Sequence, residues 1–487
     1  MDENSVVIKY LQKLGYQPST SYYSNIDLWY AWYQNFVKEF HEYHDHNGKV
    51  RRIHRLGMAK RLCEDWSSIL YTEKDDIVCK NKNNQAYVDK MLKNVKFNDN
   101  LADNIETAFW SGTVGTITRI KDVKVINKQI VKTDKTHFEL VNVDASQIIP
   151  LRIEDGNIID VAFVSTTIVG TTKAYYIEIH ELKENGYIVK NIYIDEKGNP
   201  VKNDKVPEEY ETGTDIPIFN LLSPRIVNNI DDNNGLGISI FANSTDQLET
   251  CDTVYNNFYM DFYLGGKKLF YNKKLTKYET VTYTDKETGE TVTQEIPIYP
   301  DDITKQQFQV IGDDMDHVNE DSLIHEFNPD LREADNEAGL NFALNMLSFK
   351  CGLGKDYYRF EHGQVVTATQ ALIDNRDLTG NAKKHRSAVN DYSVGIVRSL
   401  LLLGRILLGE NVDENDEIEL TDKDGFLISE EDLKEQYMSE IASGLRQPYE
   451  YRMKFFGEDE KTAKRMTGYE DNFSDNNKKE DEEEEEE

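Results

Sequence analysis

The sequence has few of the features that mark secreted or membrane-spanning proteins. It contains four cysteines in 487 residues, and none of them lies in a C-x-x-C pair. Such sparse, separated thiols are expected to be reduced and mostly buried. The start of the chain, Met1-Asp2-Glu3-Asn4, lacks the basic and apolar regions of a signal peptide. The longest apolar run, Leu400 to Leu408, contains Gly404 and Arg405 and is too short to span a membrane.

Basic residues are also scarce. Lys and Arg number 56 against 88 Asp and Glu, which gives a formal net charge of -32. A protein that coats DNA or docks on an anionic membrane needs a basic surface, so both classes are disfavoured. The negative charge does not exclude a protein that surrounds DNA without binding it tightly. The chain ends in Glu480-Asp481 and six glutamates, a like-charged block that is expected to be disordered.

Sequence motifs for catalysis are missing as well. The chain has no G-x-x-x-x-G-K-[ST] loop, no H-E-x-x-H pair and no G-x-S-x-G elbow. We therefore predict a protein that is not an enzyme, with no catalytic residue, no metal site and no cofactor. A nuclease that binds a divalent metal through scattered carboxylates is kept as the alternative.

Two clusters allow both a functional and a structural interpretation. His41, His44 and His46 could share a metal ion, but a solvated helix end is the favoured interpretation. The run from Arg51 to Arg61 is the densest basic stretch and could contact phosphates. A charged helix face that pairs with nearby acids is favoured there.

Hydrophobic spacing predicts helices before residue 113 and a β-rich domain after it. Five aromatic residues recur at steps of three and four and indicate one helix: Trp29, Trp32, Phe36, Phe40 and Tyr43. Further helices are expected from Ala59 to Leu70 and from about Leu101 to Trp110. Short β-type runs fill 113–217, and Asn185-Gly186 between two of them is a strong hairpin signal.

The second half of the chain alternates long helices with a β segment. A helix is expected from about Ser239 to Leu264, with apolar residues spaced for packing against other helices. Its stripe, Phe241 to Phe262, is wider than one partner helix would cover, which predicts a closed ring of identical subunits. A β segment from Lys268 to about Gln309 follows, and Asn328-Pro329 is expected to start a second helix that ends near Gly352.

The remaining residues are expected to form a loop, a third long helix and an acidic helical end. The loop runs from Gly354 to Gln364 and the helix from about Thr367 to Leu408. Taken together, the helices and the two β-rich stretches predict an α+β fold.

Four stretches carry a resemblance to a known family. They are Leu56-Gly57-Met58-Ala59-Lys60-Arg61-Leu62-Cys63-Glu64-Asp65-Trp66 with Thr72-Glu73-Lys74, then Phe327-Asn328-Pro329-Asp330-Leu331-Arg332, then Gly352-Leu353-Gly354 with Thr367-Ala368-Thr369-Gln370, and finally Leu445-Arg446-Gln447-Pro448-Tyr449-Glu450-Tyr451-Arg452. In their order and spacing the chain resembles the siphophage-type portal proteins of tailed bacteriophages of Gram-positive hosts. The family's third stretch usually reads T-A-T-E, so Gln370 is a departure that removes any ion pair assumed there.

The resemblance implies a portal fold divided into named parts. A wing would occupy 1–237, with a β-rich domain, and the long wing helix would occupy 366–410. Two stem helices would occupy 238–265 and 329–352 and enclose a small β clip at 266–328. A tunnel loop would follow at 353–365, a helical crown at 411–469 and a disordered acidic tail at 470–487.

The resemblance also implies a function in the virion. The family forms a dodecameric ring at one capsid vertex, assembled in the host cytoplasm, through which double-stranded DNA is packaged and ejected without sequence preference. Its partners are copies of itself, the terminase, a head-completion adaptor, and capsid and scaffolding proteins, and no membrane is involved. A different head-to-tail structural adaptor is a further alternative, which the length of the chain disfavours.

Two sets of residues are the candidates for contact with these partners. The tunnel-loop residues that could touch DNA are Lys355, Tyr357, Tyr358 and Arg359. The clip residues that could bind the terminase or the adaptor are Tyr278, Glu279, Thr280, Thr282, Tyr283, Thr291 and Thr293. An ordinary polar loop and an unpartnered surface hairpin are the corresponding structural interpretations.

Overall fold

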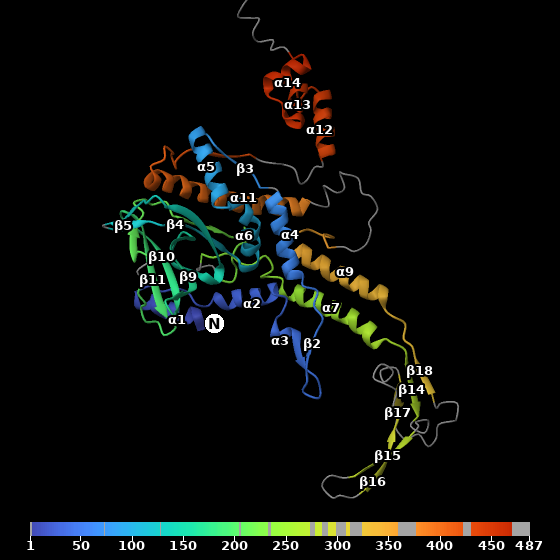
Figure 1. The fold of residues 1–487 in the computed structure, drawn as a ribbon. Helices are drawn as coiled ribbons and strands as arrows, with labels where there is room; N and C mark the ends of the chain where they lie inside the picture. The colour runs from blue at the N-terminus through green and yellow to red at the C-terminus, as the bar shows by residue number, and fades with distance from the viewer. Residues whose placement is uncertain are drawn as a thin grey trace, which may run out of the picture. The chain divides into compact units, whose positions relative to one another are not determined.

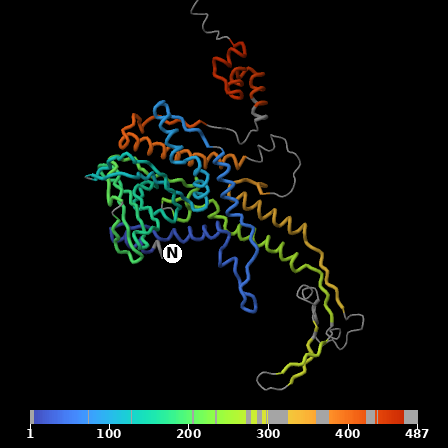
Figure 2. Tube along the Cα trace, viewed as in Figure 1, coloured from blue at the N-terminus to red at the C-terminus, as the bar shows by residue number. Residues whose placement is uncertain are grey.

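A computed structural model describes most of the chain (Figures 1 and 2). The described residues are 2–72, 74–126, 128–203, 206–231, 235–272, 278–284, 291–298, 308–311, 324–358, 376–421 and 430–469. They form two compact units, of which the first contains Met1–Ile26, Cys63–Ser239 and His362–Glu487. The second contains Asp27–Leu62 and Ile240–Glu361. Both helices and sheets are present throughout, so the predicted α+β class is confirmed.

The first unit is built on two sheets. The larger one has the strand order β5-β6-β12-β11-β10-β9-β8 and the smaller one the order β13-β4-β7. Their strands are β4 (Val114–Lys121), β5 (Lys124–Ile126), β6 (Gln129–Val131), β7 (His137–Asp144), β8 (Ile148–Glu154), β9 (Asn157–Val169), β10 (Thr172–Lys183), β11 (Gly186–Asp195), β12 (Glu209–Glu211) and β13 (Phe219–Leu222). The β-rich prediction for 113–217 is therefore confirmed, and β10 and β11 form the hairpin expected at Asn185-Gly186.

Helices pack on the smaller sheet of this unit (Figure 1). Among them are α6 (Phe97–Ser111) and α11 (Arg376–Leu403), the latter followed by a π-helical turn, Gly404–Leu408. Helix α5 (Lys82–Asn94) packs against both of these helices. The Tyr392 hydroxyl of α11 lies 2.6 Å from Thr116 Oγ1 on β4 and accepts from Asn104 Nδ2 of α6 at 3.0 Å. The expected helices at 101–110 and up to Leu408 are thus confirmed, while 367–375 lies outside the described residues.

Several further elements complete the first unit. They are α1 (Asp2–Lys13), the 3-10 turn Ala145–Gln147, and a two-stranded sheet of β3 (Asp76–Cys79) and β19 (Ile418–Thr421). Helices α2 (Tyr23–Tyr33) and α4 (Met58–Thr72) begin in one unit and end in the other. The C-terminal helices are α12 (Glu430–Ala442), α13 (Pro448–Phe456) and α14 (Glu460–Thr467). The acidic tail lies outside the described residues.

A close approach between two backbone segments explains why residue 112 of this unit is a glycine. Gly112 ends α6 with φ of 90°, in the left-handed region. A Cβ built there would lie 2.4 Å from the carbonyl oxygen of Gly237, so a side chain cannot be accommodated. Ser239 Oγ donates to the carbonyl of Phe109 nearby, at 3.1 Å.

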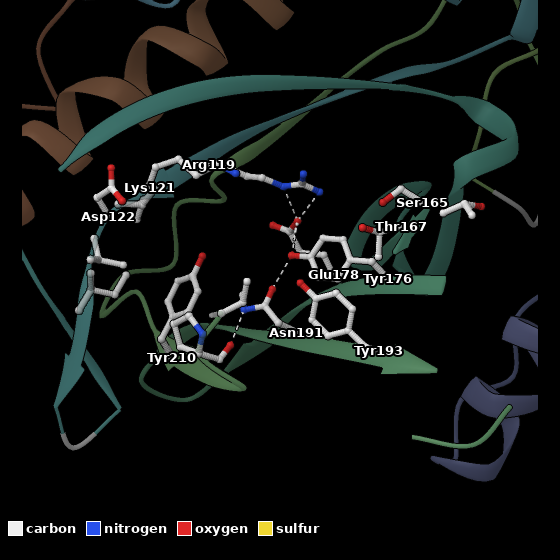
Figure 3. A pocket seen from close by; sticks show the side chains of 16 residues that line it. Arg119, Lys121, Asp122, Ser165, Thr167, Tyr176, Glu178, Asn191, Tyr193 and Tyr210 are labelled. Atoms are coloured by element: carbon white, nitrogen blue, oxygen red, sulfur yellow. Dashed lines mark hydrogen bonds and ion pairs between the residues drawn. The ribbon is translucent and has the colours of Figure 1, made fainter. Parts of the chain in front are cut away.

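An ion pair joins the two sheets of the first unit (Figure 3). Arg119 Nε on β4 donates to Glu178 Oε2 on β10 at 2.7 Å, and His180 Nε2 lies 3.2 Å from Glu178 Oε1. The pair borders a cavity of about 420 Å³ that Tyr176, Tyr193 and Asn191 also line. Burial alone would raise the pKa of Glu178, but the hydrogen bond from His180 and the charge of Arg119 outweigh it and lower the pKa to about 2.

The Arg119–Glu178 pair should matter for stability. Replacing Glu178 with Gln leaves the guanidinium without its carboxylate, and breaking a buried pair costs about 3–5 kcal/mol. Because the folded pKa is lowered from 4.5 to about 2, the stabilisation is complete above pH 4.5 and is lost as pH falls towards 2. Urea unfolding at pH values from 7 to 3 measures the free energy of unfolding of each protein. The difference in this free energy between wild type and Glu178→Gln should become smaller below pH 4.5. A difference that does not change with pH, or no difference at pH 7, would contradict the stabilising role of the pair.

The second unit contains a pair of long helices and three small sheets. The helices are α7 (Thr245–Leu264) and α9 (Glu333–Lys350), which lie side by side (Figures 1 and 2). The remaining elements are α3 (Lys38–His41), β1 (Glu42–His44), β2 (Val50–Arg52), β14 (Lys268–Asn272), β15 (Tyr278–Thr284), β16 (Thr291–Pro297), β17 (Phe308–Ile311) and β18 (Ile324–Phe327). Strand β14 lies between β17 and β18, whereas β1 pairs with β2 and β15 pairs with β16.

The prediction of one continuous helix from Trp29 to Tyr43 is wrong. Helix α2 ends at Tyr33, and Asn35 then adopts the left-handed region with φ of 59°. The backbone of Val37 is extended, and its N–H donates to His41 Nδ1 at 2.7 Å. A side chain therefore satisfies a donor that a continuous helix would have paired with a backbone carbonyl.

Two helix starts also differ from their predictions. Helix α7 begins at Thr245 and not at Ser239, whose side chain donates to the carbonyl of Phe109. Helix α9 begins at Glu333 and not at Asn328-Pro329, which directly follow strand β18. Gly352, with φ of 82°, follows the C-cap of α9 in the left-handed region, as its sequence position indicated.

The basic run at 51–61 is not one helix face. Arg51 and Arg52 lie on β2, where Arg51 Nε donates to Asp45 Oδ2 at 3.0 Å and Arg52 Nε to Glu42 Oε1 at 2.9 Å. The predicted pairing of these two arginines along a helix is therefore wrong, and a β-hairpin holds them instead.

Candidate self-assembly surface on helices α7 and α9

Helices α7 and α9 are antiparallel and share a buried seam. Apolar side chains from both helices form it: Leu248 and Cys251 from α7, and Ala343, Leu344 and Leu347 from α9. A Cβ built at Gly339 would lie 3.6 Å from Val254 Cγ1, an ordinary van der Waals distance, so the two helices are close together there. At the other end, Arg332 and Asn336 both donate to the carboxylate of Asp261, at 2.6 Å and 2.7 Å.

The acidic first turn of α9 also explains why a helix forms there. Glu333 and Asp335 lie in the first turn and Lys350 in the last. These charges complement the partial charges at the two ends of a helix. The pair of helices is thus stabilised locally as well as by its seam.

The thiols of this seam are structural. Cys251 and Cys351 are buried, and burial raises the pKa of each thiol to about 12. Thiols with raised pKa values are poor nucleophiles and poor metal ligands. All four cysteines are unpaired by disulfides and buried, so the sequence prediction for them is confirmed.

A hydrogen-bonded histidine–aspartate pair connects α7 to the segment that precedes α4. His41 Nε2 donates to Asp252 Oδ2 at 2.9 Å, and Asp252 Oδ1 accepts from the backbone N–H of Leu56 at 2.7 Å. His41 is fully buried and its Nδ1 accepts from Val37, so it carries its proton on Nε2. The three histidines do not converge: His44 lies on β1 and His46 in the following turn. Among the described residues no three side chains are arranged to hold a metal ion.

The outer faces of the helix pair expose large apolar side chains. On α9, Phe342 is 69% exposed, Met346 39% and Phe349 50%. Steps of four and three residues place these three side chains on one face of the helix. The last turns of α7 expose another group, namely Tyr259, Phe262, Tyr263 and Leu264. We call these two sets the α9 stripe and the α7 stripe.

The predicted apolar stripe of α7 is therefore divided between two environments. Phe241, Leu248 and Cys251 are buried, whereas Phe262 at the other end of the helix is exposed. Phe258 packs against Phe262 with ring centroids 4.9 Å apart. Folding of one chain therefore buries the beginning of the stripe and leaves its end exposed.

The clip residues lie on the ribbon of β15 and β16. Thr282 is the partner of Thr293, and Thr284 is the partner of Thr291. Because side chains alternate along a strand, the ribbon has two unlike faces. One face carries threonines together with Tyr278 and Glu295, and the other carries Glu279, Val281, Tyr283, Val292 and Ile296. The predicted clip residues therefore divide between both faces.

The tunnel-loop residues come directly after α9. Asn345 of α9 holds the start of this loop, because it donates to Asp356 Oδ1 and accepts from the Asp356 N–H, both at 3.0 Å. Lys355 is exposed, while Tyr357 and Tyr358 are half-buried with ring centroids 5.0 Å apart. Arg359 lies outside the described residues. The structure brings three of the four candidates together, and their contact with DNA stays a prediction.

The sequence predicts that its longest apolar run is too short to span a membrane, and the described helices can be compared with this prediction. None of them combines the length and the apolar character that crossing a bilayer requires.

Comparison with known proteins gives distant structural similarities with TM-scores of 0.40 or less. No protein-family model matches the sequence, and no curated protein matches it. The solved structures to which the chain is similar include a chain in the neck of a native gene transfer agent (GTA) particle computed with C12 symmetry, with a TM-score of 0.40 and 10% identity. A chain in the virion of a native GTA particle has a TM-score of 0.39 and 9% identity, and one in the neck of an empty GTA particle computed with C6 symmetry has 0.37 and 10%. Each match covers 81% of this chain and 88% of the other.

Proposed function

We propose that this chain is the subunit of a portal ring at one vertex of a tailed-phage capsid. The observation that carries the proposal is the pair of exposed apolar stripes on α7 and α9. Monomeric proteins rarely leave such stripes in water, and they mark surfaces that are covered by a partner. Since the two stripes lie on different helices, one copy can offer its α9 stripe where the next offers its α7 stripe. Head-to-tail contacts of this kind close into rings.

The charge of the chain suits a conduit for double-stranded DNA. A net charge of -32 disfavours tight binding of phosphates, which would slow a moving duplex. The ring would be a dodecamer, as the resemblance of the sequence to siphophage-type portal proteins implies. Lys355, Tyr357, Tyr358 and Arg359 would touch DNA lightly and without sequence preference. The terminase and a head-completion adaptor would bind the clip, and capsid and scaffolding proteins would surround the ring.

The mass of the native protein tests this proposal. We expect the purified chain to form closed particles whose mass is a large multiple of 56.4 kDa, about twelve copies. Native mass spectrometry gives the number of copies, and negative-stain microscopy shows whether the particles are rings. Monomers or dimers under every salt condition would refute the proposal. Magnesium-dependent cleavage of DNA that one carboxylate mutation abolishes would favour the nuclease instead.

A further inference from the structure

The three C-terminal helices form a module with almost no core of its own. Ala463 is the single buried apolar side chain among those described between Lys434 and Tyr469. Tyr437, Tyr451 and Phe455 touch one another, with centroids 4.6 to 6.4 Å apart, yet all three are only half-buried. About forty residues is the lower limit for a chain segment that folds without a disulfide, a metal or a partner. The module therefore needs a further surface to pack against.

The module exposes the apolar side chains that such packing would bury. Leu445 is 83% exposed, and four others are exposed as well: Met438, Met453, Phe456 and Met466. They come from α12, from the turn after it, and from α13 and α14. Capping hydrogen bonds nevertheless stabilise the starts of α13 and α14. Gln447 and Glu450 form a capping box at the start of α13, and Asp459 caps α14.

The charges of the module are unevenly distributed along it. Helix α12 has five acids and one base: Glu430, Glu431, Asp432, Glu435 and Glu440 against Lys434. Residues 446–469 have six bases and four acids: Arg446, Arg452, Lys454, Lys461, Lys464 and Arg465 against Glu450, Glu458, Asp459 and Glu460. Exposed Glu435 of α12 in one copy is therefore opposite in charge to the exposed Lys454, Lys461 and Arg465 of α13 and α14 in another. Complementary charge favours a specific encounter between such surfaces.

Three of the six cations of residues 446–469 face the module's own acids. Arg446 pairs with Glu440 at 2.7 Å, Arg452 with Glu458 at 2.7 Å and Lys464 with Glu460 at 2.8 Å. Cations held in this way are poorly placed to bind a phosphate backbone. Together with the exposed methionines and Phe456, they favour a protein partner over nucleic acid.

We propose that a second copy of this chain covers the module, with α12 of one subunit seated against α13 and α14 of its neighbour. This inference rests on the proposed ring, and it names an interface separate from the α7 and α9 stripes. Glu435 and Met438 lie three residues apart and so share one face of α12. That face would meet the neighbour's Met453, Phe456 and Lys461. The same contact repeats around the ring and completes a core that one copy lacks.

Disulfide trapping in the full-length chain tests the contact. Met438→Cys and Met453→Cys are made in separate chains, which are co-expressed with different tags and oxidised after assembly. The four native cysteines are buried and should not react. We expect a cross-linked pair that contains one chain of each kind, and no cross-link when either variant is expressed alone. The matched control combines Ile168→Cys, on an exposed residue of β9, with Met453→Cys.

Charge reversal gives a second, independent readout. Glu435→Lys and Lys461→Glu should each weaken assembly by about two- to fivefold, because exposed charge pairs contribute modestly. Combining both changes should restore assembly, and Glu196→Lys, on an exposed turn residue, should leave it unchanged.

The outcomes separate this inference from the proposed function. Absence of rings refutes the proposed function and the inference together. Rings without the mixed cross-link refute the inference alone. A cross-link of Met438→Cys with itself shows a symmetric contact and overturns the head-to-tail arrangement. If Lys461→Glu leaves assembly intact but lowers retention on a DNA-cellulose column, the module binds nucleic acid and the inference is wrong.

Discussion

Replacing Phe342 and Phe349 with Asp should leave the chain folded and unassembled. Both side chains are exposed in one copy, at 69% and 50%, so the substitutions remove little packing within it. Surface substitutions of this kind usually change stability by about 0.5 kcal/mol or less. If the α9 stripe lies between copies, each buried Phe contributes about 1.5–3 kcal/mol per contact. Losing two of them weakens each contact by about 3–6 kcal/mol, and the added carboxylates must also be desolvated.

Sedimentation velocity measures whether the variant assembles, and far-UV circular dichroism measures whether it is folded. We expect the double variant to sediment as a monomer with an unchanged spectrum. The matched control is Ile168→Asp, which places the same charge on an apolar residue of β9 that is 73% exposed. It should assemble as wild type does. A Phe342→Asp, Phe349→Asp chain that still assembles would remove the α9 stripe from the interface and leave the proposed ring without its main support.

Elements with a regular pattern could be predicted from the sequence. The hairpin of β10 and β11 follows from Asn185-Gly186, and α6 follows from its apolar spacing. The helix at 29–43 could not be predicted correctly, because a bond from Val37 to His41 interrupts it. Spacing alone does not show that a neighbouring side chain will take a backbone donor.

The contacts that hold the candidate surfaces in place are distant in sequence. His41 and Asp252 are separated by 211 residues, and Arg119 and Glu178 by 59. Neither pair stands out in the sequence, because the chain has 88 acids and most of them have no specific partner that spacing reveals. The same limit applies to the stripes: their apolar character was visible, but exposure of Phe262 and burial of Leu248 depend on the packing of α9.

Replacing Glu279 to Thr293 with a short Gly-Ser linker should abolish binding of the terminase or the adaptor. In the second unit, β15 pairs with β16 alone, so each of the two strands keeps an unpaired edge among the described residues. A two-stranded ribbon is marginally stable by itself, and unpaired edges are normally covered or used for pairing. In a ring each ribbon could pair with its neighbour's or accept a strand from another protein. Helices α7 and α9 should still fold, because their seam and the contacts of Asp261 lie outside the replaced residues.

The two faces of the ribbon allow the clip prediction to be sharpened. Val281→Lys and Tyr283→Lys change the face that carries Val292 and Ile296, whereas Thr282→Lys and Thr293→Lys change the threonine face. Pull-down of the purified partner with each variant shows which face binds. We expect the apolar face to matter more, because Tyr283 and Ile296 are 47% and 43% exposed and burying them stabilises a complex. Undiminished capture of the partner by the linker variant would mean that the ribbon is a surface hairpin without this role.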